Sequence, residues 1–82
     1  MSKVLLVDDD VELSSMLREY VVQEGFEADA VHDGEAGVAA ALSGEYALVV
    51  LDVMMPKVGG IEALGRIRAR SNVPVLMLTA RG

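Results

Sequence analysis

The sequence contains no cysteine and no tryptophan, and it has only one phenylalanine and two tyrosines. Without cysteine, the chain can form neither disulfide bonds nor zinc or iron–sulfur sites with Cys ligands. Aromatic residues make up 4% of the chain and apolar residues 52%, so any core must be built from aliphatic side chains. A chain of 82 residues can bury only a small core, and we expect one small domain.

Positive charge and long hydrophobic runs are also scarce. The net charge of −6 has the wrong sign for binding a phosphate backbone, so we expect no nucleic-acid binding by these residues themselves. No apolar run has the length of a membrane span, and the first residues show no signal-peptide pattern. These absences are compatible with a reducing cytoplasm, and we predict a cytoplasmic chain that makes no membrane contact.

Short apolar runs alternate with helical patterns along the chain. Fully apolar runs are typical of parallel strands that are buried on both faces, and an alternating run is typical of an edge strand. Right-handed crossovers between such strands predict a doubly wound α/β sheet with helices on both faces. The predicted strands are 4–7, 26–31 (alternating), 47–51 and 73–78, and the predicted helices lie near 13–21, 35–42 and 61–68.

The first two predicted helices differ in how strongly their sequences favour an amphipathic helix. The first helix is predicted to have one apolar stripe, which consists of Leu13, Met16, Leu17, Tyr20 and Val21. Ser14 falls on the opposite, polar face of the same helix. The second helix is weak, because Gly37 interrupts it and its apolar face consists mostly of alanine.

Polar side chains follow three of the apolar strands. Asp8 and Asp9 follow the first strand, Asp52 follows the run at 47–51, and Thr79 follows the last strand. Because the carboxyl ends of parallel strands lie along one edge of a sheet, we expect these groups to converge there. Three carboxylates so close together call for a raised pKa or a bound cation, and hard oxygen ligands suit Mg²⁺.

Each acidic motif also has a simpler interpretation. A lone aspartate at a strand end, such as Asp52, more often begins a turn than a site. Asp9 and Glu12 have the spacing of a capping box, so the acidic triplet could serve only to start the first helix. We interpret Asp10 as a capping or surface residue. Neither interpretation explains why Asp52 and Thr79 arrive at the same edge.

The remaining residues near these motifs carry weaker signals. His32 follows the edge strand, and we interpret it as a turn residue rather than a phosphocarrier or a ligand. The side chains of Met54 and Met55 need no cofactor to explain them. Lys57 lies close to Asp52 in the sequence, but we expect it to be solvated.

Taken together, these motifs resemble the receiver domain of two-component response regulators. Within this family, they are most similar to the CpxR-like members of the OmpR/PhoB subfamily. The fold that this resemblance implies is the flavodoxin-like (CheY-like) parallel sheet, with strand order 2-1-3-4 over the residues present. The matching segments are residues 5–10, 32–35, 51–56, 59–60 and 78–82.

The resemblance implies a chemical role for the acidic residues. Asp52 would accept a phosphoryl group from a phosphohistidine of a sensor histidine kinase. Asp8, Asp9 and Asp52 would hold Mg²⁺ together with the backbone carbonyl of Met54. Phosphoryl transfer needs alignment and charge neutralisation, which Mg²⁺ beside an aspartate nucleophile supplies.

The resemblance also implies roles for the last residues of the chain. Thr79 would hydrogen-bond the phosphoryl oxygens and move with them, and Ala80 would leave room for the phosphoryl group. Such a protein is a phosphoacceptor rather than an enzyme, and we expect its parent to be a DNA-binding transcription regulator. DNA would be bound only by a domain outside this sequence.

The match covers about the N-terminal two-thirds of the domain that the resemblance implies. We therefore interpret residues 1–82 as a receiver domain that is incomplete at its C-terminus and has no DNA-binding domain. The phosphate-binding lysine of the family and its fifth strand are not in the sequence. Without a fifth strand, the strand at 73–78 is expected to be an exposed edge through which the chain associates with itself.

Two other classes of protein remain open. An aspartyl-phosphate hydrolase of the haloacid-dehalogenase type also places its nucleophile after a buried strand, but it needs a second acid where this chain has Met54. A degenerate receiver could act purely as an interaction module. The missing lysine favours that interpretation for these residues, whereas the intact acidic residues and Thr79 argue against it for the parent.

Overall fold

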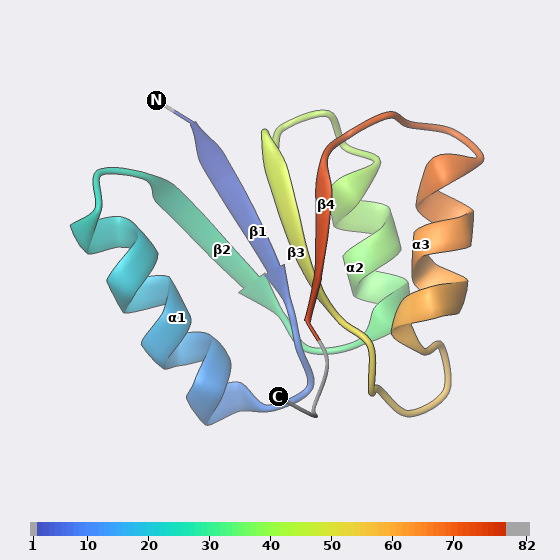
Figure 1. The fold of residues 1–82 in the computed structure, drawn as a ribbon, viewed down its shortest axis with the longest axis horizontal. Coiled ribbons are helices and arrows are strands. Elements are labelled where there is room, and N and C mark those ends of the chain that lie inside the picture. The colour runs from blue at the N-terminus through green and yellow to red at the C-terminus, as the bar shows by residue number, and fades with distance from the viewer. Residues whose placement is uncertain (1, 79–82) are drawn as a thin grey trace.

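The computed structural model describes residues 2–78, which form a four-stranded parallel sheet with helices on both faces (Figure 1). The strands are ordered β2-β1-β3-β4, so the predicted order 2-1-3-4 and the doubly wound α/β class are confirmed. The elements along the chain are β1 (Lys3–Val7), α1 (Val11–Gln23), β2 (Glu27–Val31), α2 (Gly34–Ala41), β3 (Leu48–Asp52), α3 (Gly60–Arg68) and β4 (Val75–Leu78).

The register of the sheet brings the ends of β1 and β3 side by side. Val7 of β1 lies opposite Val31 of β2 and opposite Leu51 of β3. All of these strands run parallel, so the residues that follow Val7 and Leu51 lie at neighbouring positions along one edge of the sheet. Those residues are Asp8 and Asp52, which are therefore placed together by backbone pairing alone.

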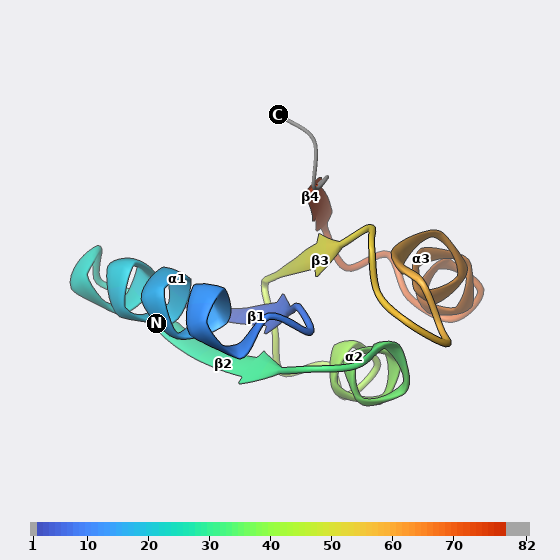
Figure 2. The ribbon, with the colours of Figure 1, turned by 90° about the horizontal axis from the view of Figure 1, so that it is seen from below.

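The helices form two unequal layers. Helix α1 covers β1 and β2 on one face of the sheet, and α2 and α3 cover the other face (Figure 2). The main core lies between the sheet and α2 and α3, and its aliphatic character confirms the expectation from composition. Its buried members are Leu5, Val7, Ala41, Val49, Leu51, Val58, Ala63 and Ile67.

Helix α1 buries only part of its predicted apolar stripe, since Leu17 and Val21 are half-buried but the other members are exposed. Leu13, Met16 and Tyr20 are 41%, 66% and 62% exposed. Ser14 is completely buried, so its predicted position on the polar face is wrong. The Ser14 hydroxyl is satisfied because it donates a hydrogen bond to the carbonyl oxygen of Asp10 at 2.6 Å. Within residues 2–78, no helix lies beside α1 over β3 and β4 (Figure 2).

Strand β3 is buried fully on only one face. Val49 and Leu51 belong to the main core, whereas Leu48 and Val50 on the opposite face are half-buried. The prediction of a strand buried on both faces is therefore wrong for the face that α1 does not reach. In β4, Leu76 is 53% exposed, and this strand is an edge of the sheet among the described residues.

Two glycines allow helices to approach the sheet closely. A Cβ atom on Gly37 would lie 2.5 Å from Cγ1 of Val7, so Gly37 lets α2 pack directly on β1. It does not interrupt α2, and the prediction that it does is wrong. A Cβ atom on Gly60 would lie 2.3 Å from the carbonyl oxygen of Asp52. The start of α3 is thereby held against the end of β3, next to the acidic residues.

Among residues 2–78, no helix combines the length and the apolar character needed to cross a membrane.

Candidate functional site

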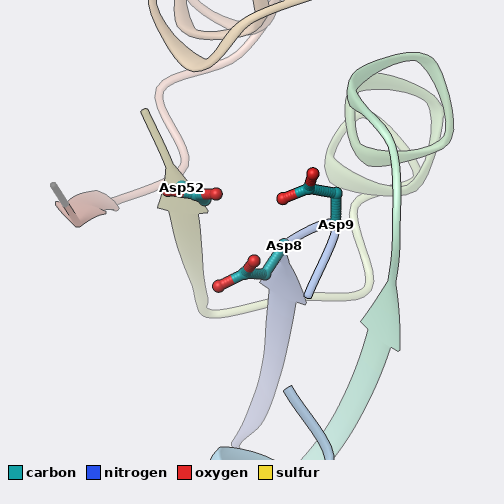
Figure 3. A group of neighbouring side chains, drawn as sticks. All are labelled: Asp8, Asp9 and Asp52. Atoms are coloured by element: carbon teal, nitrogen blue, oxygen red, sulfur yellow. The ribbon is translucent and has the colours of Figure 1, made fainter. Parts of the chain in front are cut away.

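Three carboxylates meet at the carboxyl edge of the sheet (Figure 3). Asp8 and Asp9 follow β1, and Asp52 is the last residue of β3. One carboxylate oxygen from each residue lies within 4.8 Å of the others. Asp8 is 7% exposed, Asp52 is half-buried and Asp9 is exposed, so the group forms the floor and rim of a surface site. The structure thus brings together the three acidic residues singled out in the sequence, and their roles remain predictions.

In the turn between β1 and α1, the carboxylates of Asp8 and Asp10 accept different hydrogen bonds. Asp10 is the N-cap of α1, and its carboxylate accepts a hydrogen bond from the backbone N–H of Leu13 at 3.0 Å. The prediction of Asp10 as a capping residue is confirmed, and the alternative of a capping box at Asp9 and Glu12 is wrong. The carboxylate of Asp8 accepts a hydrogen bond from the backbone N–H of Asp10 at 2.9 Å, which fixes its position in the turn.

Burial raises the pKa of Asp52 above its ordinary value, and the negative charges of Asp8 and Asp9 act in the same direction. The backbone N–H of Met54 donates a hydrogen bond to Asp52 at 3.2 Å and opposes this rise. This hydrogen bond is typical of a turn that begins at an aspartate, which is the simpler interpretation of Asp52 given above. Burial, the main cause of the raised pKa, disfavours the ionised form of Asp52, and the neighbouring carboxylates add to this effect.

The donor set fits a hard divalent cation. The carboxylates of Asp8, Asp9 and Asp52 provide oxygen ligands of the kind that Mg²⁺ prefers, with room for water. A positive ion there would relieve the repulsion that contributes to the raised pKa of Asp52. The surrounding surface pocket of about 360 Å³ is lined by Asp8, Asp9, Asp10, Leu13, Asp52, Met54 and Leu78.

Of the other predicted site residues, Met54 borders the pocket, whereas Thr79 and Ala80 lie outside the described residues. Leu78, which precedes them, borders the pocket. Its backbone carbonyl accepts a hydrogen bond from the N–H of Val53 at 2.9 Å, which fixes the end of β4 beside the end of β3.

Neither of the two lysines in the chain borders this pocket. Lys3 lies at the opposite end of β1, where its ammonium group is 3.2 Å from Asp29 and 3.4 Å from Glu45. Lys57 lines a different pocket, together with Asp33 and other residues at the start of α2. Lysine therefore supplies no charge compensation to the carboxylates among residues 2–78.

His32 makes a contact with the site that sequence reasoning missed. Its Nδ1 atom lies 3.0 Å from the backbone carbonyl oxygen of Asp8. We interpreted His32 as a turn residue, because a single histidine after an edge strand shows no spacing pattern that would indicate a partner. The contact depends on the parallel pairing that places the end of β2 beside the end of β1.

Comparison with known proteins identifies the class to which this fold and site belong. The family model described as response regulator receiver domain matches residues 4–82, and the chain belongs to this family. The chain is therefore the receiver domain of a two-component response regulator, and the haloacid-dehalogenase alternative is set aside.

Among individual relatives, the chain is similar to the transcriptional regulatory proteins called CpxR, which confirms the predicted resemblance. It is 54% identical to the CpxR homolog of Haemophilus influenzae and 50% identical to CpxR of Escherichia coli K12, in both cases over 82 residues. These alignments cover 100% of this chain but only 36% and 35% of the two relatives. The chain thus spans about a third of the length of these curated relatives.

Solved structures support the same fold. The response regulator TrrA of Thermotoga maritima, crystallised in complex with Mg²⁺-BeF, matches with a TM-score of 0.92 and 36% identity. This match covers 100% of our chain and 72% of the TrrA chain. TrrA also matches, with a TM-score of 0.92, in its complex with the histidine kinase ThkA. The CheY-like fold is therefore confirmed.

The raised pKa of Asp52 predicts that Asp52→Asn stabilises the metal-free chain at neutral pH. A carboxyl group whose pKa is higher in the folded than in the unfolded state binds its proton more tightly when folded. Its ionisation therefore lowers stability as pH rises from the ordinary value of 3.8 to the raised folded value, and the cost is complete at pH 7. Asparagine removes this charge and keeps an oxygen for the N–H of Met54.

We expect the free energy of unfolding to rise by about 1 kcal/mol in Asp52→Asn at pH 7 in EDTA. The gain should shrink as the pH is lowered through 3.8, because Asp52 is then protonated in both states. Urea unfolding of both proteins at several pH values measures this difference. Equal or lower stability of the variant at pH 7 would show that Asp52 carries no electrostatic penalty.

Proposed function

We propose that Asp52 accepts a phosphoryl group from a phosphohistidine of a sensor histidine kinase. An oxygen of the Asp52 carboxylate attacks phosphorus, the bond from phosphorus to the histidine nitrogen breaks, and its electron pair returns to the imidazole. The product is an acyl phosphate on Asp52. The observation that carries this proposal is the approach of three carboxylate oxygens within 4.8 Å at the end of β3. TrrA, which was crystallised with a histidine kinase, supports the choice of partner.

In this proposal Asp8, Asp9 and Asp52 hold Mg²⁺ together with the backbone carbonyl of Met54. The ion, when bound, neutralises charge that builds up on the phosphoryl oxygens and on the carboxylates. The structure of TrrA with Mg²⁺-BeF supports the choice of metal. By the family resemblance, Thr79 would hydrogen-bond the phosphoryl group and Ala80 would leave space for it.

The parent protein would convert this modification into gene regulation. Both CpxR relatives are named as transcriptional regulatory proteins, and this chain spans about a third of each. We place DNA binding in a domain outside the present sequence, and we place the transfer in the cytoplasm, where kinases find ATP. The chain itself is a phosphoacceptor that assists its own modification, not an enzyme that turns over a separate substrate.

A second candidate is a receiver that acts only as an interaction module. The position of the two lysines favours it, because neither borders the pocket that would hold the phosphoryl group. In that case the acidic residues would still bind metal, but Asp52 would not be phosphorylated. Labelling of Asp52 separates the two candidates.

Magnesium titration tests the metal site directly. We expect the chain to bind Mg²⁺ weakly, with a dissociation constant on the order of millimolar, because few protein ligands are available and water fills the remaining positions. Asp9→Ala should weaken binding about tenfold or more, because it removes one carboxylate from the cluster. Amide NMR shifts of residues around Asp8 and Asp52 measure the affinity.

Glu12→Ala is the matched control, because it removes an exposed carboxylate from the first turn of α1 outside the cluster. It should leave the affinity for Mg²⁺ within about twofold of the original value, since screening by salt reduces the effect of exposed charges. An affinity that is unchanged in Asp9→Ala, or equally reduced in both variants, would contradict a site built from the three aspartates.

A further inference from the structure

Two of the three site carboxylates lie in the short turn between β1 and α1. The backbone of this turn is held by the N–H of Asp8, which donates to the carbonyl of Val31 at 3.1 Å. The hydroxyl and the N–H of Ser14 both donate to the carbonyl of Asp10, at 2.6 and 3.0 Å. The positions of Asp8 and Asp9 relative to Asp52 therefore depend on how firmly this turn is attached to β2 and α1.

His32 joins the two sets of contacts. Its Nδ1 atom lies 3.0 Å from the carbonyl oxygen of Asp8 and 3.5 Å from the hydroxyl oxygen of Ser14. A carbonyl oxygen can only accept, so Nδ1 must carry the proton in this contact. The Ser14 hydrogen is directed to Asp10, which leaves the Ser14 oxygen as a second, more distant acceptor for His32. Although the His32 side chain is largely exposed, its Nδ1 atom contacts the backbone of Asp8, whose carboxylate belongs to the site.

A water molecule would hold the turn less firmly than His32, because the imidazole is attached to the end of β2. With His32 in place, Ser14 is fully buried and Asp8 is 7% exposed. Loss of the imidazole N–H would leave the Asp8 carbonyl without this donor, and the turn would gain freedom to shift. A shift of the turn would move Asp8 and Asp9 away from their present approach to Asp52, on which metal affinity depends.

We propose that His32 is a positioning residue of the magnesium site, which fixes the backbone of Asp8 so that its carboxylate and that of Asp9 point at Asp52. The proposal rests on the proposed function of this site. His32 does not bind the ion and does not transfer the phosphoryl group. It acts through the carbonyl of Asp8, from the end of β2.

Two substitutions separate positioning from simple packing. His32→Leu removes the donor, whereas His32→Asn retains an N–H donor close to the position of Nδ1. We expect His32→Leu to weaken Mg²⁺ binding about tenfold, the effect typical of losing a partner that orients a metal ligand. His32→Asn should recover most of the affinity. Magnesium titrations followed by NMR, with urea unfolding of each variant in EDTA, provide both readouts.

The outcomes distinguish this inference from the function on which it rests. If the unmodified chain does not bind Mg²⁺, the proposed function fails and the inference fails with it. If the unmodified chain binds Mg²⁺ and His32→Leu binds equally well while folded, only the inference is wrong. Equal losses in His32→Leu and His32→Asn would also overturn it, because the donor would then be irrelevant.

The proton position gives a readout that needs no metal. Long-range ¹H–¹⁵N correlation spectra at pH 8 distinguish the two neutral tautomers of histidine, and we expect His32 to carry its proton on Nδ1. A proton on Nε2 would exclude the hydrogen bond to Asp8 and overturn the proposal.

Discussion

Phosphorylation of the 82-residue chain by a small acyl-phosphate donor is expected to be slow, fully dependent on Mg²⁺ and confined to Asp52. Lys3 is engaged by Asp29 and Glu45 at the far end of β1, and Lys57 lines a separate pocket. Apart from the metal, no lysine compensates the phosphoryl charge among residues 2–78. Losing one such electrostatic partner typically costs about 10²–10³ in rate, and we expect this deficit relative to a receiver that contains the family lysine.

Time courses of labelling with and without EDTA measure this rate and its metal dependence. Asp52→Asn should remove the label completely. Asp33→Asn is the matched control, because it makes the same chemical change outside the cluster and asparagine caps a helix as well as aspartate does. Labelling as fast as in a receiver with the lysine, or label that persists in Asp52→Asn, would contradict the proposed site.

The second large effect concerns association of the chain with itself. Strand β4 is an edge of the sheet among the described residues, it carries no charge, and Leu76 is 53% exposed. The backbone carbonyls of Pro74 and Leu78 accept hydrogen bonds from β3. In a parallel strand, alternate residues direct their backbone N–H and C=O groups to opposite sides, so those of Val75 and Met77 are directed to the open edge. Such an apolar edge is a template for pairing with another chain.

We therefore expect the 82-residue chain to associate as its concentration rises through roughly 1–100 μM. Complete burial of an exposed apolar side chain contributes about 1.5–3 kcal/mol, and covering the half-exposed Leu76 would contribute part of this. Sedimentation at several concentrations measures the state of association. Leu76→Lys should shift it toward monomer, because a charged edge residue opposes pairing.

Ile61→Lys provides the control for added charge. Ile61 is 68% exposed and belongs to α3 rather than to β4, so this variant should associate as the original chain does. A well-folded monomer at all concentrations, or equal effects of the two lysine substitutions, would show that β4 does not mediate association.

The parts of the site that the sequence predicts are those that follow from strand pairing. Val4 to Val7 and the run that ends at Leu51 are apolar enough to identify two buried parallel strands, whose carboxyl ends must lie along one edge of the sheet. The close approach of Asp8 and Asp52 also requires that the two strands be neighbours, which the resemblance implied and the pairing of β1 with β3 confirms. The alternating run at 26–31 favours an edge strand, and the full strand order 2-1-3-4 was implied by the family resemblance and is confirmed.

The features that the sequence did not predict depend on contacts between elements. Ser14 is polar by type, but its hydroxyl is satisfied by the carbonyl one turn earlier, so its burial costs little. Gly37 weakens a helix when judged by propensity, but at this position only glycine fits against Val7. His32 acquires its partner from a neighbouring strand. Periodicity within one element contains none of this information.

Chemical identification of the phosphorylated residue is the decisive measurement. After prolonged incubation with Mg²⁺ and a phosphorylated histidine kinase, borohydride reduction converts an aspartyl phosphate to homoserine, which tandem mass spectrometry locates in the sequence. We expect homoserine at position 52, only when Mg²⁺ and the phosphorylated donor are both present. Homoserine at position 8 or 9 instead, or none at any aspartate under these conditions, would contradict the assignment of Asp52 as the phosphoryl acceptor.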